Sequence, residues 1–495
     1  MRGEIAKGAA WMVLFRLFDR SIGIVSTALL ARLLIPADFG LVAMAMSIIA
    51  LIELATAFSF EIALIQKQDP QREHFDTAWT LNVLVALCGA AVTAAAAYPA
   101  AAFYGDPRLG PVMLAIGAAW VILGLENIGI VNFRREMNFA AEFRLMASKR
   151  VVSFACTVVA AIAFRSYWAL VVGMAMGRLT GMTLSYLMHP YRPRFCLTNA
   201  RELFSFSGWL LISNIGMVLS TRVPHIWIGR AFGAQTLGAY TVASEIASLA
   251  QTELIAPINR AMFPGYSRLV SDPPAFRKTC LDATSTILLI VLPVSVGIAV
   301  LAAPFVRLLL GEQWGEAVPI IKVLAIAGAM MALTSNNMAA YQALGRPHLT
   351  TATLAVRLVV VAAAMALLYR PYGVLGVAYA ELLASSAGML FSLPFLLSSI
   401  HLPLSDYMRA LWRPLVASAV MGWVVSQVID ASVPTAHIGA AAMQMLEGVF
   451  AGALAYPIVL ALLWFVSGRP DSIEVQITRW AVGALRARRA RNAAA

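Results

Sequence analysis

Apolar stretches of about 20 residues recur along this chain from residue 9 to residue 466. Each stretch is long enough to cross the hydrocarbon core of a bilayer, which is about 30 Å thick. Only 13% of the residues are charged, whereas soluble domains carry roughly 25%. A soluble globule has no interior large enough to bury this much apolar surface. The sequence therefore predicts an integral membrane protein.

Gly, Pro and charged residues divide the apolar sequence into segments. The segments cover residues 9–34, 38–65, 76–98, 109–131, 145–164, 167–188, 204–228, 235–257, 280–302, 317–343, 348–369, 372–398, 409–429 and 440–466. Inside lipid, helices and closed barrels are the structures that satisfy their own backbone hydrogen bonds, and these segments are too long and uniform for barrel strands. We therefore predict an all-α, polytopic membrane protein with about fourteen transmembrane helices.

Positive charge is concentrated in alternate connections between the segments. With a cytoplasmic N-terminus, the connections on the outer side hold only six of the basic residues, namely Arg32, Arg108, Arg165, Arg230, Arg307 and Arg370. Most other Lys and Arg residues then lie inside, as the positive-inside rule requires. The net charge of +12 thus suits a bacterial inner membrane with both termini cytoplasmic. Because the basic residues form no single stripe, no nucleic-acid partner is expected.

An internal repeat emerges when the chain is aligned with itself at an offset of 198 positions. Arg32 then aligns with Arg230, and Gly40 with Gly238. Since six helices separate the copies, the repeat is parallel, with its axis along the membrane normal. The predicted organisation is two six-helix bundles, two additional helices and a basic cytoplasmic tail, over residues 1–201, 202–402, 403–467 and 468–495.

Sequence signatures of catalysis and of metal or nucleotide binding are missing. The chain contains no H-E-x-x-H, no P-loop and no G-x-S-x-G, and its four cysteines form no C-x-x-C pair. The six histidines fall near segment ends at unrelated depths. We therefore expect neither an enzyme nor a metal or cofactor site.

Ionisable and amide residues lie inside several apolar segments, where each charge costs about 2.5 to 3.5 kcal/mol to insert. Arg16, Asp19 and Arg20 share one face of the first helix because they are spaced by three and four residues. Under the repeat offset, Arg16 aligns with Asn214 and Glu53 with Gln251. The other residues singled out are Arg222, Glu245 and Arg357.

Two interpretations account for these charges. In the first, a solvated cavity between the bundles holds an anionic headgroup, because guanidinium donates paired hydrogen bonds to phosphate. Arg16, Arg20, Arg222 and Arg357 are then the headgroup ligands, while Asp19, Glu53, Asn214, Gln251 and Glu245 are polar or gating residues of the cavity. In the second, the charges form ion pairs that lock the helices together.

Two sequence segments carry a resemblance to a known family. They are the N-terminal run containing ARLLIPADFG and the later run LLGEQWGEAVPIIKVLAIAG. With the fourteen-segment layout, they resemble the polysaccharide transporter, or Wzx-type, branch of the multidrug, oligosaccharidyl-lipid and polysaccharide exporter superfamily. The likeness extends over nearly the whole chain.

The resemblance implies a flippase. It implies two bundles that move a polyprenyl-pyrophosphate-linked oligosaccharide to the periplasmic leaflet by alternating access, for synthesis of lipopolysaccharide, capsule or exopolysaccharide. Membrane lipids, and a polysaccharide polymerase with its export machinery, are the further expected partners. A lipid II flippase and a cation-coupled drug exporter of the same superfamily remain alternatives, as does a membrane polysaccharide polymerase or ligase.

Overall fold

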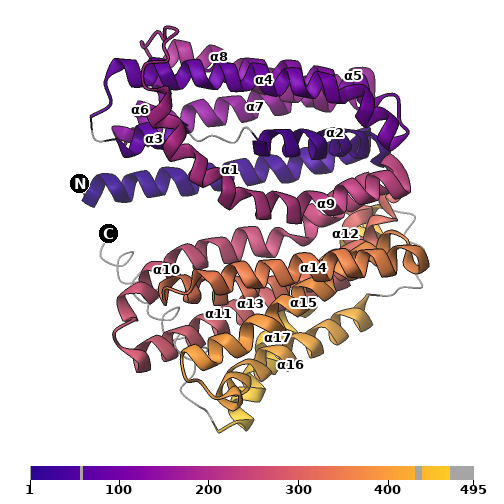
Figure 1. Ribbon diagram of the computed structural model, residues 1–495. Coiled ribbons are helices and arrows are strands. Elements are labelled where there is room, and N and C mark those ends of the chain that lie inside the picture. The colour runs from indigo at the N-terminus through magenta and orange to yellow at the C-terminus, as the bar shows by residue number, and fades with distance from the viewer. Residues whose placement is uncertain (1, 56–59, 68, 430–437, 469–495) are drawn as a thin grey trace, which may run out of the picture. The chain divides into compact units, whose positions relative to one another are not determined.

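The computed structural model describes residues 2–55, 60–67, 69–429 and 438–468 (Figure 1). These residues form helices joined by short turns, and no strand occurs among them. The predicted all-α class is therefore confirmed. The basic tail beyond Gly468 lies outside the described residues.

Each predicted apolar segment overlaps a helix. Among the described residues, nine helices are long and apolar enough to cross a membrane, or up to ten if a bent pair counts as one span. Helices α1 (Arg2–Leu33) and α16 (Leu404–Val428) match predicted segments but are not among those nine. Both contain charged residues in their interiors, including Arg16 in α1 and Arg413 in α16. The prediction of a polytopic membrane protein is confirmed.

The predicted segment 109–131 is not one straight helix. Helix α5 (Leu109–Gly124) ends, and the chain restarts in the 3-10 turn η1 (Ile128–Ile130) and α6 (Val131–Arg135). The two parts are bent by 62°. The cause is local, because the Asn127 side chain accepts a hydrogen bond from Gly129 N at 2.9 Å and caps the new turn.

Two other predicted segments, 204–228 and 235–257, share most of one long element. Helix α9 (Ala200–Ala247) covers the first segment and part of the second. It is kinked between them at Gly233, whose φ of 80° and ψ of −176° are not helical. Glycine adopts this backbone geometry without strain. The chain then continues through a π-helical turn, η2 (Gln251–Ile255), into α10 (Ala256–Leu269).

The chain divides into two compact units. Unit 1 extends to Thr241 and also contains Leu309–Trp314, whereas unit 2 comprises Val242–Leu308 and the residues from Gly315 onward. The boundary defined by contacts thus falls within α9, not near residue 201. The division of the sequence by repeat, into 1–201, 202–402 and 403–467, stays a prediction.

Unit 1 is built around contacts between neighbouring helices. Helix α7 (Phe139–Phe164) packs against α1 and α8 (Trp168–Met188), and α5 packs against α2 (Pro36–Ala55), α4 (Arg72–Tyr104) and α8. These indigo to violet helices run roughly alongside one another in Figure 1. The ring of Phe143 joins α7 to α1, since its centroid lies 5.0 Å from Trp11, 6.2 Å from Phe15 and 6.1 Å from Phe18.

Two glycines that align in the repeat touch each other inside unit 1. A Cβ atom on Gly40 of α2 would lie 1.7 Å from the carbonyl oxygen of Ala234 in α9. A Cβ atom on Gly238 would lie 1.8 Å from the carbonyl oxygen of Pro36. The two helices therefore cross backbone to backbone, and only glycine fits at either position.

The two segments that carried the family resemblance meet in unit 1, at the C-terminal end of α1. The carbonyl oxygen of Ala31, in the last turn of α1, accepts hydrogen bonds from Gln313 Nε2 at 2.6 Å and from Trp314 Nε1 at 2.8 Å. The Trp314 ring lies edge-on to Phe39, 5.2 Å between centroids. Residues from the later segment thus satisfy a carbonyl that the end of α1 leaves without a helical partner.

Several helices of unit 2 are joined by buried polar side chains. Besides α10, the unit contains α11 (Pro273–Val300), α12 (Ala302–Leu309), α13 (Ala317–Ala343), α14 (Pro347–Tyr372), α15 (Val374–Ser399), α16 and α17 (Ile438–Val466). Asn336 of α13 accepts from Tyr266 of α10 and donates to Thr284 of α11, each at 2.9 Å. Such hydrogen bonds hold apolar helices in register where no water competes.

Candidate functional site

The charged residues of α1 include one that contacts α7 directly. Asp19 forms an ion pair with Arg150 of α7, with 2.9 Å between Oδ1 and Nε. Arg16 and Arg20 lie on the same stretch of α1 as Asp19, and both side chains are half-buried. The sequence alone paired Asp19 with the arginines of its own helix, but the structure adds a third guanidinium from α7.

A second charged group in unit 1 centres on Glu53, near the end of α2. Arg178 of α8 and Arg222 of α9 lie near enough to act electrostatically on its carboxylate. Arg178 also donates to the carbonyl oxygen of Ile116 at 3.2 Å. The structure therefore brings two of the predicted site residues, Glu53 and Arg222, into one neighbourhood.

A polar pocket of about 310 Å³ lies in unit 1 at the break between α5 and η1. Its polar lining consists of three carboxylates and two carboxamides, and Trp120 adds an aromatic wall: Glu53, Glu61, Glu126, Asn82, Asn127 and Trp120. Helix breaks at membrane depth are tolerated where the backbone is buried in protein or lines a watery cavity. Of these lining residues, only Glu53 was assigned to a cavity from the sequence.

Basic side chains accompany the carboxylates of this pocket. Lys149 of α7 donates to both oxygens of Glu126, at 3.0 and 3.1 Å. Arg134 lies 3.7 Å from a carboxylate oxygen of Glu61. Together with the arginines that act on Glu53, these residues offset much of the negative charge of the pocket.

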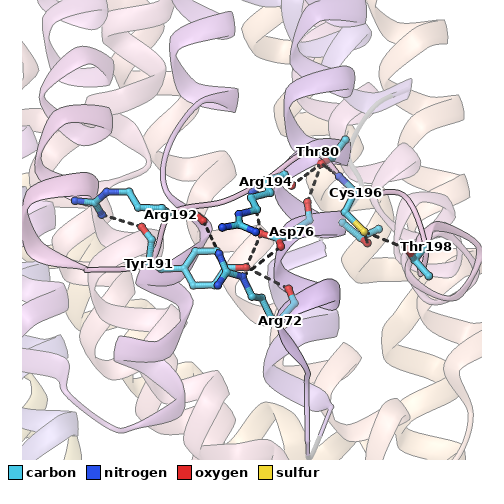
Figure 2. A network of polar contacts seen from close by, with 9 residues as sticks. Arg72, Asp76, Thr80, Tyr191, Arg192, Arg194, Cys196 and Thr198 are labelled. Carbon is cyan, nitrogen blue, oxygen red and sulfur yellow. Dashed lines mark hydrogen bonds and ion pairs between the residues drawn. The ribbon is translucent and has the colours of Figure 1, made fainter.

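The connection between α8 and α9 forms a strap across α4, and Figure 2 shows its contacts. We define the strap as residues 189–199. The carboxylate of Asp76 in α4 accepts from the Tyr191 hydroxyl at 2.7 Å and from Arg194 N at 2.9 Å. One turn further along α4, Thr80 Oγ1 accepts from Cys196 N at 3.0 Å.

The electrostatics of the strap favour this arrangement. Burial, together with the hydrogen bond to Asp76, raises the pKa of the Tyr191 hydroxyl above its usual value, so the phenol remains a donor near neutral pH. Hydrogen bonds with Thr198 lower the pKa of the half-exposed Cys196 thiol.

The strap also supports the helix break beside the pocket. Asn127 Nδ2 donates to the carbonyl oxygen of Tyr191 at 2.7 Å, and Asn127 N donates to Ser185 Oγ at 2.9 Å. The residue that caps η1 is therefore held from both α8 and the strap. Displacement of the strap would disturb the wall of the pocket.

Replacement of Asp76 by Ala is expected to lower the free energy of unfolding by about 2 to 4 kcal/mol, because the Tyr191 hydroxyl and the Arg194 amide lose their common acceptor at once. The measurement is the thermal unfolding midpoint of the purified protein. The matched control is Asp406→Ala, since Asp406 makes an exposed pair with Arg409 at 3.6 Å and should cost less than about 1 kcal/mol. Equal midpoints for the two variants would contradict this role of the strap.

The predicted site residues beyond Thr241 belong to unit 2. Arg357 of α14 binds Glu381 of α15, with 3.0 Å between Nη2 and Oε2, and both side chains are mostly buried. Glu245 is exposed near the end of α9, and Gln251 opens the π-helical turn. Asn214 lies in α9, but its side chain falls outside what the structure describes. The Arg357 pair is the arrangement that the ion-pair interpretation anticipated.

Unit 2 contains an apolar groove of about 440 Å³. It runs between α11, α12, α16 and α17, and includes Val294, Phe305, Met421, Val449 and Tyr456. No carboxylate, amine or amide belongs to its lining. The groove suits a hydrocarbon chain and not a polar headgroup.

Comparison with known proteins agrees with this architecture. The family described as polysaccharide biosynthesis protein matches residues 29–319. The chain is 25% identical over 342 residues to the lipopolysaccharide biosynthesis protein WzxC of Escherichia coli (strain K12), covering 67% of this chain and 68% of that protein. It is 22% identical over 471 residues to the succinoglycan biosynthesis transport protein ExoT of Rhizobium meliloti (strain 1021), covering 92% of this chain and 93% of that protein.

Among solved structures, the lipid II flippase MurJ in an inward closed conformation superposes with a TM-score of 0.71. The identity is 15%, and the match covers 92% of this chain and 100% of that chain. At such identity the likeness establishes a shared fold. The chain therefore belongs to the polysaccharide biosynthesis protein family, and its resemblance to the Wzx-type branch of the exporter superfamily is confirmed.

Proposed function

We propose that this protein is a flippase that moves a polyprenyl-pyrophosphate-linked oligosaccharide across the inner membrane, from the cytoplasmic to the periplasmic leaflet. The observation that carries the proposal is the cluster of guanidinium groups on membrane-embedded helices of a chain from this family. Arg16 and Arg20 share a face of α1 with Asp19, and Asp19 forms an ion pair with Arg150 of α7. Guanidinium is well suited to a pyrophosphate, because its donors pair with phosphate oxygens.

In this proposal the parts of the substrate occupy different surroundings. The pyrophosphate binds the α1 arginines together with Arg222, and Arg357 contributes if its pair with Glu381 opens. The sugars occupy polar surroundings, for which Glu53, Asn214, Gln251 and Glu245 are the proposed lining residues, with Asp19 as an acidic partner for the arginines. The polyprenyl chain stays in lipid or in the apolar groove of unit 2.

Transport by alternating access is part of the same proposal. The binding surfaces would face the cytoplasm and the periplasm in turn, with both chain termini cytoplasmic as the distribution of Lys and Arg predicts. A polymerase and export machinery would then take up the delivered unit. The name of one relative, a succinoglycan biosynthesis transport protein, supports transport and not catalysis.

A lipid II flippase is the second candidate, because the fold is shared with MurJ. The two candidates predict different phenotypes when the gene is deleted. A flippase for surface polysaccharide gives cells that grow with ordinary walls but lack capsule, O-antigen or exopolysaccharide, whereas loss of a sole lipid II flippase stops wall synthesis. Microscopy of growing cells and gel analysis of surface polysaccharide distinguish them. Normal surface polysaccharide in the deletion strain would contradict the proposal.

A further inference from the structure

The polar pocket in unit 1 has the features of a ligand site beyond the headgroup arginines. It lies where α5 is interrupted and bent by 62° before η1, and Glu126 and Asn127 of that break face it. Interrupted helices in transporters commonly line the site where the substrate binds. The volume of about 310 Å³ is at the lower end of the range for small-molecule sites, roughly 300–1,000 Å³. It suits one sugar residue and not an oligosaccharide.

The charges around the pocket favour a neutral ligand. Each of its three carboxylates has a basic neighbour: Lys149 for Glu126, Arg134 for Glu61, and Arg178 with Arg222 for Glu53. This compensation weakens the attraction for a bare cation. None of the four basic residues belongs to the lining of the pocket, so a bound anion would contact the carboxylates directly and be disfavoured. Their oxygens nevertheless retain lone pairs, which accept hydrogen bonds from hydroxyl groups.

Two further residues complete a surface for a polyhydroxylated ring. Among the described residues, the Asn82 carboxamide of α4 has no hydrogen-bond partner, so its donors and acceptor are available to a ligand. Trp120 provides an apolar wall, and its ring is held against α4 because Gly89 has no Cβ: such an atom would lie 2.6 Å from the indole. Carboxylate, amide and aromatic groups together match the hydroxyls and the C–H face of a sugar.

We propose that this pocket is a subsite for a single neutral sugar residue, bound by the Asn82 carboxamide and the carboxylates of Glu53 and Glu61 with Trp120 beneath the ring. The inference rests on the proposed function, because the sugar would belong to the translocated oligosaccharide. Uronic acids should bind more weakly than neutral sugars, because their carboxylate would lie against the carboxylates of the lining. The strap reaches the pocket through Asn127 and keeps its wall in place.

The test is binding of free sugars to the full-length protein in nanodiscs, measured by saturation-transfer NMR. The probes are glucose, galactose, N-acetylglucosamine and glucuronate. At least one neutral sugar should give a signal, and glucuronate should give a weaker one. Asn82→Ala should weaken the binding roughly five- to tenfold, and should fold normally because the structure gives Asn82 no hydrogen-bond partner among the residues that it describes. The matched control is Asn259→Ala in unit 2, whose amide bonds Ser335 at 2.8 Å and which should bind sugar as the unaltered protein does.

Three results would overturn the subsite. The first is the lack of any signal from the neutral sugars, and the second is equal sugar binding by the Asn82→Ala variant and the unaltered protein. The third is that the protein binds no sugar but retains ²²Na⁺, and that Glu53→Gln abolishes this retention. The last result would identify a cation site. Failure of the proposed function is detected separately, because it leaves the unaltered protein unable to flip a lipid-linked oligosaccharide whatever the sugar-binding result.

Discussion

Gly40→Val is expected to prevent accumulation of folded protein. A Cβ atom at this position would lie 1.7 Å from the carbonyl oxygen of Ala234 and 2.9 Å from the amide nitrogen of Gly238. Both are backbone atoms, so no side-chain rotation relieves the overlap, and the crossing of α2 and α9 must separate. The loss exceeds the range of about 1 to 3 kcal/mol for ordinary overpacking. Size-exclusion chromatography of the detergent-extracted protein measures the folded fraction.

The matched control for Gly40 is Gly265→Val. Gly265 lies in α10, and an added Cβ atom there meets nothing within 4 Å. Since valine has a higher helix propensity than glycine, this variant should accumulate at least as well as the unaltered protein. A monodisperse Gly40→Val protein with an unchanged unfolding midpoint would show that α2 and α9 do not cross as described.

Reversal of both α1 charges, Arg16→Glu with Arg20→Glu, is expected to reduce transport at least roughly tenfold, because charge-assisted hydrogen bonds to the pyrophosphate are lost and repulsion replaces them. The measurement is the rate of flipping of a lipid-linked oligosaccharide in proteoliposomes containing the purified variant. Arg409→Glu is the control, since that side chain is 80% exposed and should leave the rate unchanged.

The charge-reversal experiment separates the two interpretations of the α1 charges. If Arg16 and Arg20 mainly lock helices together, the double variant loses stability but transports at the normal rate per folded molecule. If they bind the headgroup, the rate falls while the unfolding midpoint changes little. Unchanged transport by a stably inserted variant would remove these residues from the proposed site.

The helical architecture was predictable because its signal is local. Apolar length and the placement of turns depend only on neighbouring residues, and each of the fourteen predicted segments overlaps a helix. The bend after Gly124 was not predicted, because the segment 109–131 is apolar apart from Glu126 and Asn127 and the cap depends on one residue, Asn127. An Asn followed by an Ile-Gly-Ile sequence is too common a pattern to mark a break.

Contacts between distant segments were beyond the reach of the sequence pattern. The motif residues Phe39 and Trp314 stood in two segments that carried the same family resemblance, yet nothing in their spacing indicated that they touch. Likewise, the alignment of Gly40 with Gly238 suggested a repeat but not a shared crossing. The strap was missed because the sequence around Tyr191 and Arg194 reads as an ordinary basic loop.

The site residues were predictable only in part. Buried charge in apolar segments drew attention to Glu53 and Arg222, which share one neighbourhood in unit 1. The same criterion did not extend to Asn82, since a neutral amide costs less to insert than a charge and stands out less. Ion pairs such as Arg357 with Glu381 depend on which helices are neighbours, and the tertiary structure is needed to know that.

The most direct measurement is transbilayer movement of a polyprenyl-pyrophosphate-linked oligosaccharide in liposomes that contain the purified protein. Substrate in the outer leaflet is detected by its accessibility to a membrane-impermeant oxidant of sugars. A flippase should make nearly all of the substrate accessible within minutes, whereas empty liposomes should leave the inner-leaflet half protected. Protection equal to that in empty liposomes, with correctly inserted and folded protein, would contradict the account.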